Sequence, residues 1–436
     1  KRQKMNQQPQ FQVPTKSSSL NTFSFQNNAL YAESIPVMDL MAQYGSPLYV
    51  YSRTEIEQNW QQFDEAFGEH PHLICYAVKA NSNLAVLNTL ANLGSGFDIV
   101  SIGELERVIA AGGMPSRCVF SGVAKAKAEI QKALEIGIYC FNVESEGELG
   151  RIQSVAKEIG IVAPISIRIN PDVDAKTHPY ISTGLKENKF GVDVDTALSL
   201  YQMAEQSEYL KICGLDYHIG SQISDVLPFI EALDKALELI SRLQSDGIKI
   251  SHLDLGGGIG ISYKDEQTIN ISDYVQSVLS RVGELKILLE PGRAIVGNAG
   301  IFVTQVEYLK RNSIKSFAIV DGAMNDLMRP SLYGAYHKAV VVKESSDGIE
   351  GKWDLVGPVC ETGDFLAKDR DLKLNQGDYI AMMSAGAYGF VLSSNYNTRP
   401  RVAEVMVAGN RHTLVRRREE VKSLFENEFF LDEETD

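Results

Sequence analysis

The sequence has few cysteines, no long apolar run and no excess of positive charge. Its 436 residues include only five cysteines, which are scattered and lack a CxxC spacing. This pattern argues against a disulfide framework or a metal site and fits a reducing compartment. No apolar run reaches the roughly 18 residues of a transmembrane span. We therefore expect a cytoplasmic protein without a membrane partner.

Positive charge is also scarce. Acidic residues number 56 against 42 Lys and Arg, which gives a net charge of −14. The basic run at 416–418 is followed at once by Glu419 and Glu420. Such a chain is repelled by the phosphate backbone unless it has a local basic groove, so we do not expect nucleic acid as a partner. The acidic balance suits a small substrate that carries an amine.

Composition and periodicity predict four parts of the chain. Residues 1–25 are rich in Gln, Ser and Asn and are expected to form a disordered tail. Residues 26–50 are expected to join a C-terminal β-domain at 297–436, where apolar residues recur with a period of two. Residues 51–296 alternate short apolar runs with helical periods.

Eight apolar runs with helical segments between them predict a (β/α)8 barrel. The region is close to the about 250 residues typical of that fold. The fold class is therefore α/β, a TIM barrel with a second, mostly β domain. A doubly wound open sheet has the same period and is the alternative. The strand runs are 72–80, 95–101, 118–122, 139–145, 163–170, 213–221, 251–258 and 287–293, and helices are expected at 83–94, 103–113, 127–137, 194–206 and 227–247.

Polar residues at the carboxyl ends of these runs are the first candidates for a site, because barrel enzymes place their active sites there. Lys79 ends the first run in the sequence YAVKAN. A desolvated lysine has a lowered pKa and can form a Schiff base. Spacing alone favours the simpler interpretation, in which the lysine extends to solvent.

The seventh and eighth runs end in glycine-rich segments. Gly256, Gly257 and Gly258 allow close approach of a ligand, although a tight turn explains them equally well. Glu290 and Arg293, in EPGR, either pair with each other or face one ligand. Barrels commonly bind phosphate after strands 7 and 8, which favours a cofactor that carries a phosphate.

Two further residues have competing interpretations. His218 ends the sixth run, where a hydrogen-bonded core histidine is the commoner explanation and stacking on a planar cofactor is the alternative. Cys360 lies in GPVCETGD, where a small buried residue and a reactive thiol are equally plausible.

Together these segments resemble the fold-type III decarboxylases that use pyridoxal 5'-phosphate (PLP). The resemblance extends over about residues 30–415, and the specificity residues are similar to those of members that act on diaminopimelate. The stretches that carry it include YAVKANSN, YHIGSQI, HLDLGGGIGI, EPGRAIVGNAG, MNDLMRPSLYGAYH, VGPVCETGDF and GAYGF.

The resemblance implies a role for each matching residue. Lys79 binds PLP covalently, His218 stacks on its ring, and Glu290 pairs with its pyridine nitrogen. The phosphate lies on the backbone of the three glycines, Gly292 and Arg293. Tyr388 contacts both PLP and substrate. The catalytic set is Lys79, His218 and Cys360, of which Cys360 donates a proton. The substrate-binding set is Arg293, Arg329, Tyr333, Glu361 and Tyr388.

The resemblance also implies a reaction and an assembly. The expected activity converts meso-2,6-diaminopimelate to L-lysine and CO2, the last step of lysine biosynthesis. The site is expected to lie between two subunits of a homodimer, with Cys360 and Glu361 contributed across the interface. Decarboxylases of ornithine, arginine or carboxynorspermidine share the fold and are the alternative. A PLP-binding regulator or an amino-acid racemase fits the residues less well.

Overall fold

The computed structural model describes residues 22–174 and 188–431. Residues 1–21, most of the segment expected to be disordered, lie outside the described residues. The first strand begins at Phe23, two residues before the expected end of that segment. The precise limits of the predicted domains stay a prediction.

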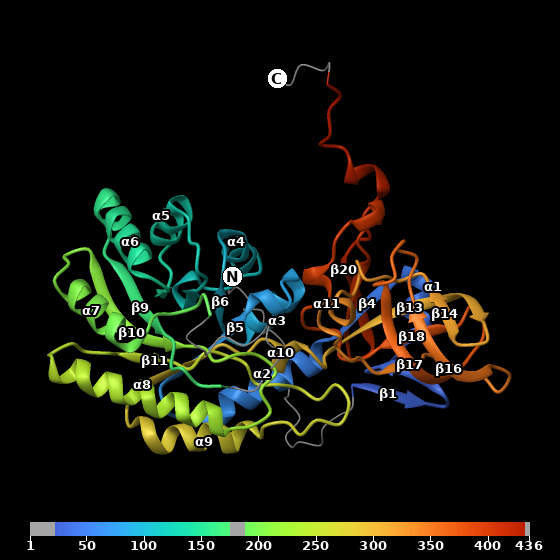
Figure 1. Ribbon diagram of the computed structural model, residues 1–436, viewed down its shortest axis with the longest axis horizontal. Helices are drawn as coiled ribbons and strands as arrows, with labels where there is room; N and C mark the ends of the chain where they lie inside the picture. The colour runs from blue at the N-terminus through green and yellow to red at the C-terminus, as the bar shows by residue number, and fades with distance from the viewer. Residues whose placement is uncertain (1–21, 175–187, 432–436) are drawn as a thin grey trace, which may run out of the picture.

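Eight parallel strands close into a barrel, which confirms the predicted (β/α)8 fold and excludes the open sheet (Figure 1). Each strand pairs with the next, and the last pairs with the first through Ile287 opposite His72. The short strands are almost entirely buried, as parallel strands covered on both faces should be. They are β5 His72–Ala77, β6 Gly96–Ile99, β7 Cys118–Phe120, β8 Cys140–Val143, β9 Ala163–Ile169, β10 Leu210–Tyr217, β11 His252–Asp254 and β12 Lys286–Leu289.

Helices alternate with these strands and form the outer layer of the barrel. Most begin at a polar residue whose side chain accepts a backbone N–H of the first turn, which satisfies one donor that the helix leaves unpaired. These capping residues are Ser52, Asn83, Ser101, Ser145, Asp193 and Asn270. The helices are α2 Arg53–Phe67, α3 Leu84–Asn92, α4 Ile102–Ala110, α5 Lys127–Ile136, α6 Glu146–Ile159, α7 Val194–Glu205, α8 Leu227–Ser245, α9 Ile271–Val282 and the short α10 Arg293–Val296.

The second part of the molecule is mostly β, and the N-terminal segment belongs to it as predicted. Strand β4, Leu48–Ser52, lies between β13 and β19 in a nine-stranded sheet. Three short strands, β1 Phe23–Gln26, β2 Ala29–Ala32 and β3 Ile35–Pro36, form a separate sheet beside it. The other elements are α1 Val37–Tyr44, β13 Gly300–Arg311, β14 Ser316–Val320, α11 Arg329–Tyr333, β15 Ala339–Val341, β16 Ile349–Val356, β17 Phe365–Leu374, β18 Tyr379–Met382, β19 Ala403–Ala408 and β20 Arg411–Arg416.

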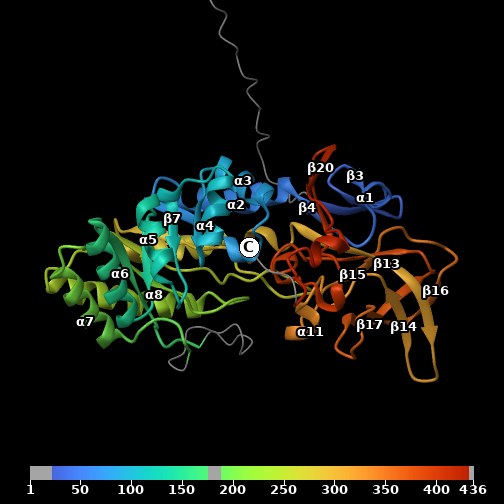
Figure 2. The same ribbon diagram turned by 90° about the horizontal axis from the view of Figure 1, so that it is seen from above.

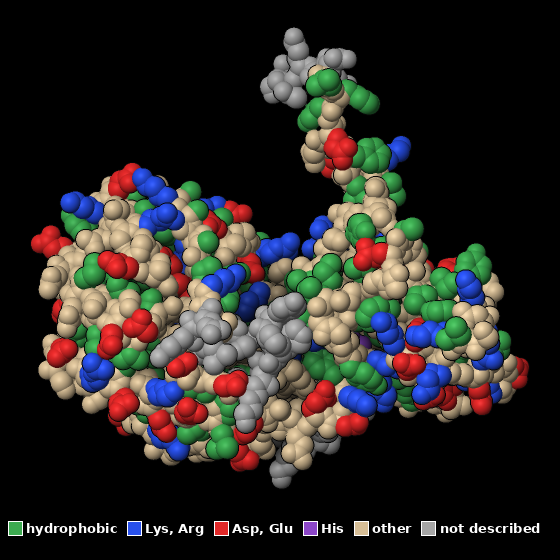
Figure 3. Space-filling model, in the orientation of Figure 1, with side chains coloured by type: hydrophobic (Ala, Val, Ile, Leu, Met, Phe, Trp, Pro, Cys, Tyr) green, Lys and Arg blue, Asp and Glu red, His purple; other side chains and the backbone are tan. Residues whose placement is uncertain are grey.

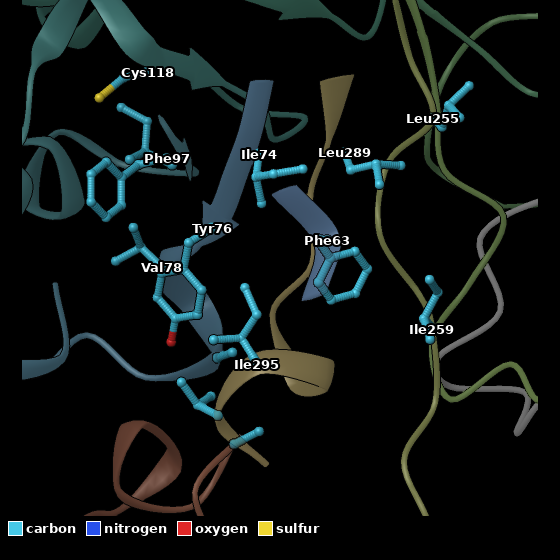
Figure 4. Packing of buried hydrophobic residues seen from close by; sticks show 14 of the residues in the cluster. Phe63, Ile74, Tyr76, Val78, Phe97, Cys118, Leu255, Ile259, Leu289 and Ile295 are labelled. Carbon is cyan, nitrogen blue, oxygen red and sulfur yellow. The ribbon is translucent and has the colours of Figure 1, made fainter. Parts of the chain in front are cut away.

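The barrel and the β-sheets lie side by side, with α5 to α8 at one end and β13 to β17 at the other (Figure 2). One apolar cluster extends from the barrel helices into the sheet. Figure 4 shows part of it, where Tyr76 and Val78, at the end of the first barrel strand, lie beside Ile295 of α10. This packing fixes the chain that leads to Lys79.

The C-terminal segment after β20 extends away from the body of the molecule and carries apolar side chains on its surface (Figure 3). Phe429 and Phe430 are 66% and 80% exposed. No helix among the described residues has the length and apolar character that a membrane crossing requires.

Candidate active site

A cavity of about 340 Å³ opens at the carboxyl ends of the barrel strands, next to the β-domain. It brings together six of the residues predicted from the sequence: Lys79, His218, Arg293, Arg329, Tyr333 and Tyr388. A narrower pocket continues below it between Lys79 and the glycine-rich segments, where Gly258, Glu290 and Gly292 join the lining. The strand ends and the two segments after strands 7 and 8 therefore form one site.

Lys79 lies in a 3-10 turn, Val78–Ala80, directly after β5. Its Nζ donates to Oδ2 of Asp98 at 2.8 Å, and the Asp98 side chain is fully buried on β6. Burial opposes the positive charge, but Asp98, Glu290 and Tyr388 outweigh it and raise the pKa of Lys79. The expected lowering of this pKa by desolvation is therefore wrong for the free amine, because two carboxylates face it.

Backbone contacts hold the Lys79 turn against the β-domain. Tyr76 donates its hydroxyl to the carbonyl of Asn81 at 2.9 Å, and the Asn81 amide donates to the carbonyl of Gly386 at 3.0 Å. The N–H of Tyr388 donates to the carbonyl of Ala80 at 2.8 Å. Tyr388 itself has a φ of +54°, an uncommon conformation for a residue with a side chain. The lysine and Tyr388 are thus fixed relative to each other.

Glu290 ends the eighth strand run at the bottom of the deep pocket and is buried. Carboxylate oxygens of Glu290, Asp254 and Asp216 lie within 4.8 Å of one another. Burial and the neighbouring carboxylates raise the pKa of Glu290 and of Asp216, and raise the pKa of Asp254 to about 6. Two cations oppose this rise: Nε of Arg168 lies 3.9 Å from Oδ2 of Asp216, and Lys79 acts on Glu290. Among the described residues, the side-chain partners of Arg293 are Tyr263 and Ser221, so the pair between Glu290 and Arg293, the simpler interpretation of the motif, is not formed there.

His218 accepts the N–H of Gly257 at its Nδ1, at 3.1 Å. Burial, Arg168 and Lys79 lower the pKa of His218 far below its ordinary value, so the ring is neutral. Its proton is consequently on Nε2. A neutral, oriented imidazole beside Lys79 is suited to stacking on a planar ring, the second of the two interpretations that the sequence allowed.

The three glycines form a cradle that side chains would fill. A Cβ at Gly257 would lie 2.1 Å from the carbonyl oxygen of Glu290, and one at Gly258 would lie 2.2 Å from that of Gly220. Gly256 has a φ of +66°, and its N–H already donates to Asp254. The backbone N–H groups of Gly256 and Gly257 are therefore occupied. Gly258 is the member of the triad that lines the deep pocket.

Two buried arginines face the cavity, and both have neutral partners. Arg293 donates to the hydroxyls of Tyr263 and Ser221, the latter at 3.1 Å. Arg329 donates to Nε2 of His337 at 2.8 Å and lies over the Tyr263 ring, 4.5 Å from its centre. Within residues 22–174 and 188–431, neither arginine forms an ion pair with a carboxylate. The upper cavity is therefore a preformed site for an anionic group.

Cys360 and Glu361 are predicted residues that lie away from the cavity. Both are exposed and lie between β16 and β17 in the β-domain. The N–H of Cys360 donates to Asn397 at 3.3 Å, and Tyr396 donates to Glu361 at 2.8 Å. Their side chains thus face outward, where another subunit can approach.

The sequence analysis did not identify the polar side chains on the barrel strands or the residues that contact the two arginines. The signal for the strand residues was a single polar residue within an apolar strand, as in GFDI, CFNV and ISIRI. Tyr263 and His337 gave no signal, because only the fold places them beside Arg293 and Arg329. The missed residues that line or support the site are Asp98, Asn142, Arg168, Asp216, Ser221, Asp254, Tyr263 and His337.

The comparisons with known proteins define the class. Residues 53–297, more than half of the chain, match the family described as "Pyridoxal-dependent decarboxylase, pyridoxal binding domain". The chain therefore belongs to the PLP-dependent decarboxylases of the (β/α)8-barrel type, and it is a lyase.

Individual relatives define the member of that class. The chain is 57% identical to diaminopimelate decarboxylase of Vibrio cholerae, over 95% of this chain and all of the relative. It is 46% identical to the Helicobacter pylori diaminopimelate decarboxylase solved with L-lysine, with a TM-score of 0.87 over 90% and 99% of the two chains. The M. jannaschii enzyme with L-lysine is 36% identical, with a TM-score of 0.89 over 94% and 98%. The chain belongs to the diaminopimelate decarboxylase family.

The residues present fit PLP, the cofactor of this class. The deep pocket combines a lysine amine, a glycine cradle and a buried carboxyl group. Several buried polar atoms there have no hydrogen-bond partner in the described part of the chain, among them Nε of Arg293, Oδ1 of Asp98 and Oδ2 of Asp254. A polar, planar group with a phosphate and a ring nitrogen suits these contacts.

Proposed function

We propose that this chain decarboxylates meso-2,6-diaminopimelate to L-lysine and CO2 with PLP, the last step of lysine biosynthesis. One observation carries the proposal: Lys79 shares a cavity with two arginines that have no carboxylate partner among the residues the structure describes. The lysine suits covalent attachment of PLP, and the arginines suit a substrate with a second carboxylate. The relatives crystallised with L-lysine support the same reaction.

The deep pocket would hold PLP by its reactive carbon, its ring and its phosphate. Lys79 would hold the cofactor covalently through Nζ, and Asp98 Oδ2, 2.8 Å from Nζ, would accept the proton of the free amine. His218 would stack on the ring. The backbone of Gly258, Gly292 and Arg293 would bind the phosphate, since these residues line the pocket. Gly256 and Gly257 would support this binding by permitting close approach rather than by donating their N–H groups.

Bound PLP supplies an electron sink for the electron pair that remains when the C–CO2 bond breaks. Glu290 would hold a proton at the pyridine nitrogen, which increases the capacity of that sink. Burial and the neighbouring carboxylates raise the pKa of Glu290, so this carboxyl group keeps a proton available that it would share with the pyridine nitrogen. The resulting ion pair would be buried and charge-assisted.

The upper cavity would bind the distal end of the substrate. Arg293 and Arg329 would pair with the distal carboxylate, with Tyr333 and Tyr388 beside them. A substrate that lacks this carboxylate would leave a buried cation unpaired, which is the basis for rejecting ornithine or lysine. The two arginines therefore favour diaminopimelate over the diamino acids with a single carboxylate.

We also propose that the active unit is a homodimer. Cys360 and Glu361 are exposed and do not line the cavity of their own chain. The partner subunit's Cys360 would deliver the proton that replaces CO2, and the partner subunit's Glu361 would bind the distal ammonium. A cytoplasmic location fits the five unpaired cysteines.

The experiment is a turnover assay with and without PLP. The purified protein is given meso-diaminopimelate, and CO2 and L-lysine are measured for the wild type and for Lys79→Ala. Equal amounts of both products from the PLP-loaded wild type, with little from the apo-protein or the variant, support the proposal. Turnover that is independent of PLP or of Lys79 would disprove it.

A further inference from the structure

Three arginines among the described residues are buried, and their partners differ in charge. Arg168, inside the barrel, pairs with Glu144 at 2.8 Å. Arg329 has the imidazole of His337 instead, and Arg293 has two hydroxyls. Burying a guanidinium without a carboxylate is unfavourable, so the neutral partners of the two cavity arginines require an explanation.

His337 follows α11 and is completely buried. Its Nδ1 lies 2.9 Å from the carbonyl oxygen of Met383, and its Nε2 lies 2.8 Å from Nη1 of Arg329. A carbonyl only accepts and a guanidinium only donates, so the hydrogen is on Nδ1 and the lone pair is on Nε2. A doubly protonated ring would direct an N–H at the arginine and lose the second hydrogen bond.

The surroundings maintain this neutral state. Burial, followed by the charge of Arg329, lowers the pKa of His337 to about 3. Arg293 and Arg370 act in the same direction, and the His337 ring lies nearly perpendicular to that of Tyr263, with 5.4 Å between the ring centres. The backbone around His337 is also fixed, because the N–H of Met383 donates to the carbonyl of Lys338 at 2.8 Å.

We infer that His337 is a positioning residue: it orients the Arg329 guanidinium by a neutral hydrogen bond, leaving its full charge for the substrate's distal carboxylate. A carboxylate at this position would fix the arginine equally well but would cancel its charge. The inference rests on the proposed function and deepens it, since it concerns how the same site selects its substrate class. Tyr263 completes the arrangement as the surface on which Arg329 lies.

Two substitutions separate the two hydrogen bonds of the ring. His337→Gln can place its amide oxygen near the position of Nε2 and retain an acceptor for Arg329. His337→Asn is shorter, so it can retain the bond to Met383 but leaves Arg329 without an acceptor. His337→Glu supplies an acceptor that carries a negative charge. The three variants therefore test geometry and charge separately.

The experiment measures binding of pimelate, a seven-carbon dicarboxylate without amines, to the PLP-loaded protein by calorimetry. We expect His337→Asn to weaken binding about tenfold, or about 1.4 kcal/mol. His337→Gln should recover affinity to within about threefold of wild type, and His337→Glu should weaken it at least as much as His337→Asn. Wild-type affinity in His337→Glu would overturn the requirement for a neutral partner.

A double variant distinguishes positioning from a general structural role. In an Arg329→Gln background, His337→Asn should change pimelate affinity less than twofold, because the residue acts through Arg329. An equal tenfold loss in both backgrounds would overturn the inference. For turnover of meso-diaminopimelate, His337→Asn should raise KM about tenfold with little change in kcat. A wild type that binds pimelate through Arg329 but does not decarboxylate meso-diaminopimelate would refute the proposed function and leave this inference standing.

Discussion

The role of Arg329 leads to a quantitative prediction. The guanidinium is buried, donates to His337 at 2.8 Å and has no carboxylate partner in the described part of the chain. Burial lowers the pKa of Arg329, which indicates that the cation lacks compensation until an anion arrives. A hydrogen bond to a charged group contributes about 1.5–3 kcal/mol. Arg329→Gln should therefore lower kcat/KM for meso-diaminopimelate by about 10- to 150-fold.

The assay follows CO2 release over a range of substrate concentrations, with retained PLP absorbance as the control for folding. Most of the loss should appear in KM, because the distal carboxylate is remote from the bond that breaks. Any slow turnover of ornithine should not fall, since ornithine has no carboxylate for Arg329 to bind. A kcat/KM for meso-diaminopimelate within twofold of wild type would refute this reasoning.

Four further predictions concern the cofactor, the assembly and stability. Lys79→Ala should lose the visible absorbance of bound PLP after dialysis, and an unchanged spectrum would contradict the assignment of the lysine. Glu290→Gln should retain PLP but lower kcat about 10²-fold, the scale of a lost electrostatic contact at the reacting group; near-normal kcat would argue against proton holding at the ring nitrogen. Lys79→Ala and Cys360→Ala should each have little activity, whereas an equal mixture that exchanges subunits should recover about a quarter of it; no recovery would contradict a shared site. Burial lowers the pKa of His252 to about 3, so the stability that its neutral form contributes is complete above its unfolded pKa of about 6.5 and declines as pH falls. From pH 7.5 to 5 the free energy of unfolding should fall by about 2 kcal/mol through this residue. In urea unfolding, His252→Phe should therefore show a smaller decline over the same range.

Much of the fold could be predicted because each barrel strand is a short apolar run with a polar end. The strand β5 begins at His72 as expected, and β12 ends just before Glu290. The order of the strands follows because each strand is connected to the next by one helix, and such a connection places the next strand beside it in parallel. Residues 349–374 were harder, because β16 and β17 carry charged residues on an exposed face.

The site was predictable residue by residue but not as an electrostatic unit. The positions of Lys79 and His218 at strand ends follow from the pattern. The pKa of Lys79 does not, since its direction depends on Asp98, which the neighbouring strand places 2.8 Å away. Likewise, no sequence pattern indicates that Arg329 contacts His337, because this contact depends on the path of the turn between them.

The central claim is that this cavity selects diaminopimelate by its second carboxylate. The most direct measurement gives the PLP-loaded protein meso-diaminopimelate, ornithine and arginine separately and compares the release of CO2 and amine. We expect L-lysine and CO2 from meso-diaminopimelate and little product from the other two. Comparable CO2 release from ornithine or arginine would contradict it, because substrates with one carboxylate would then satisfy a site built around Arg293 and Arg329.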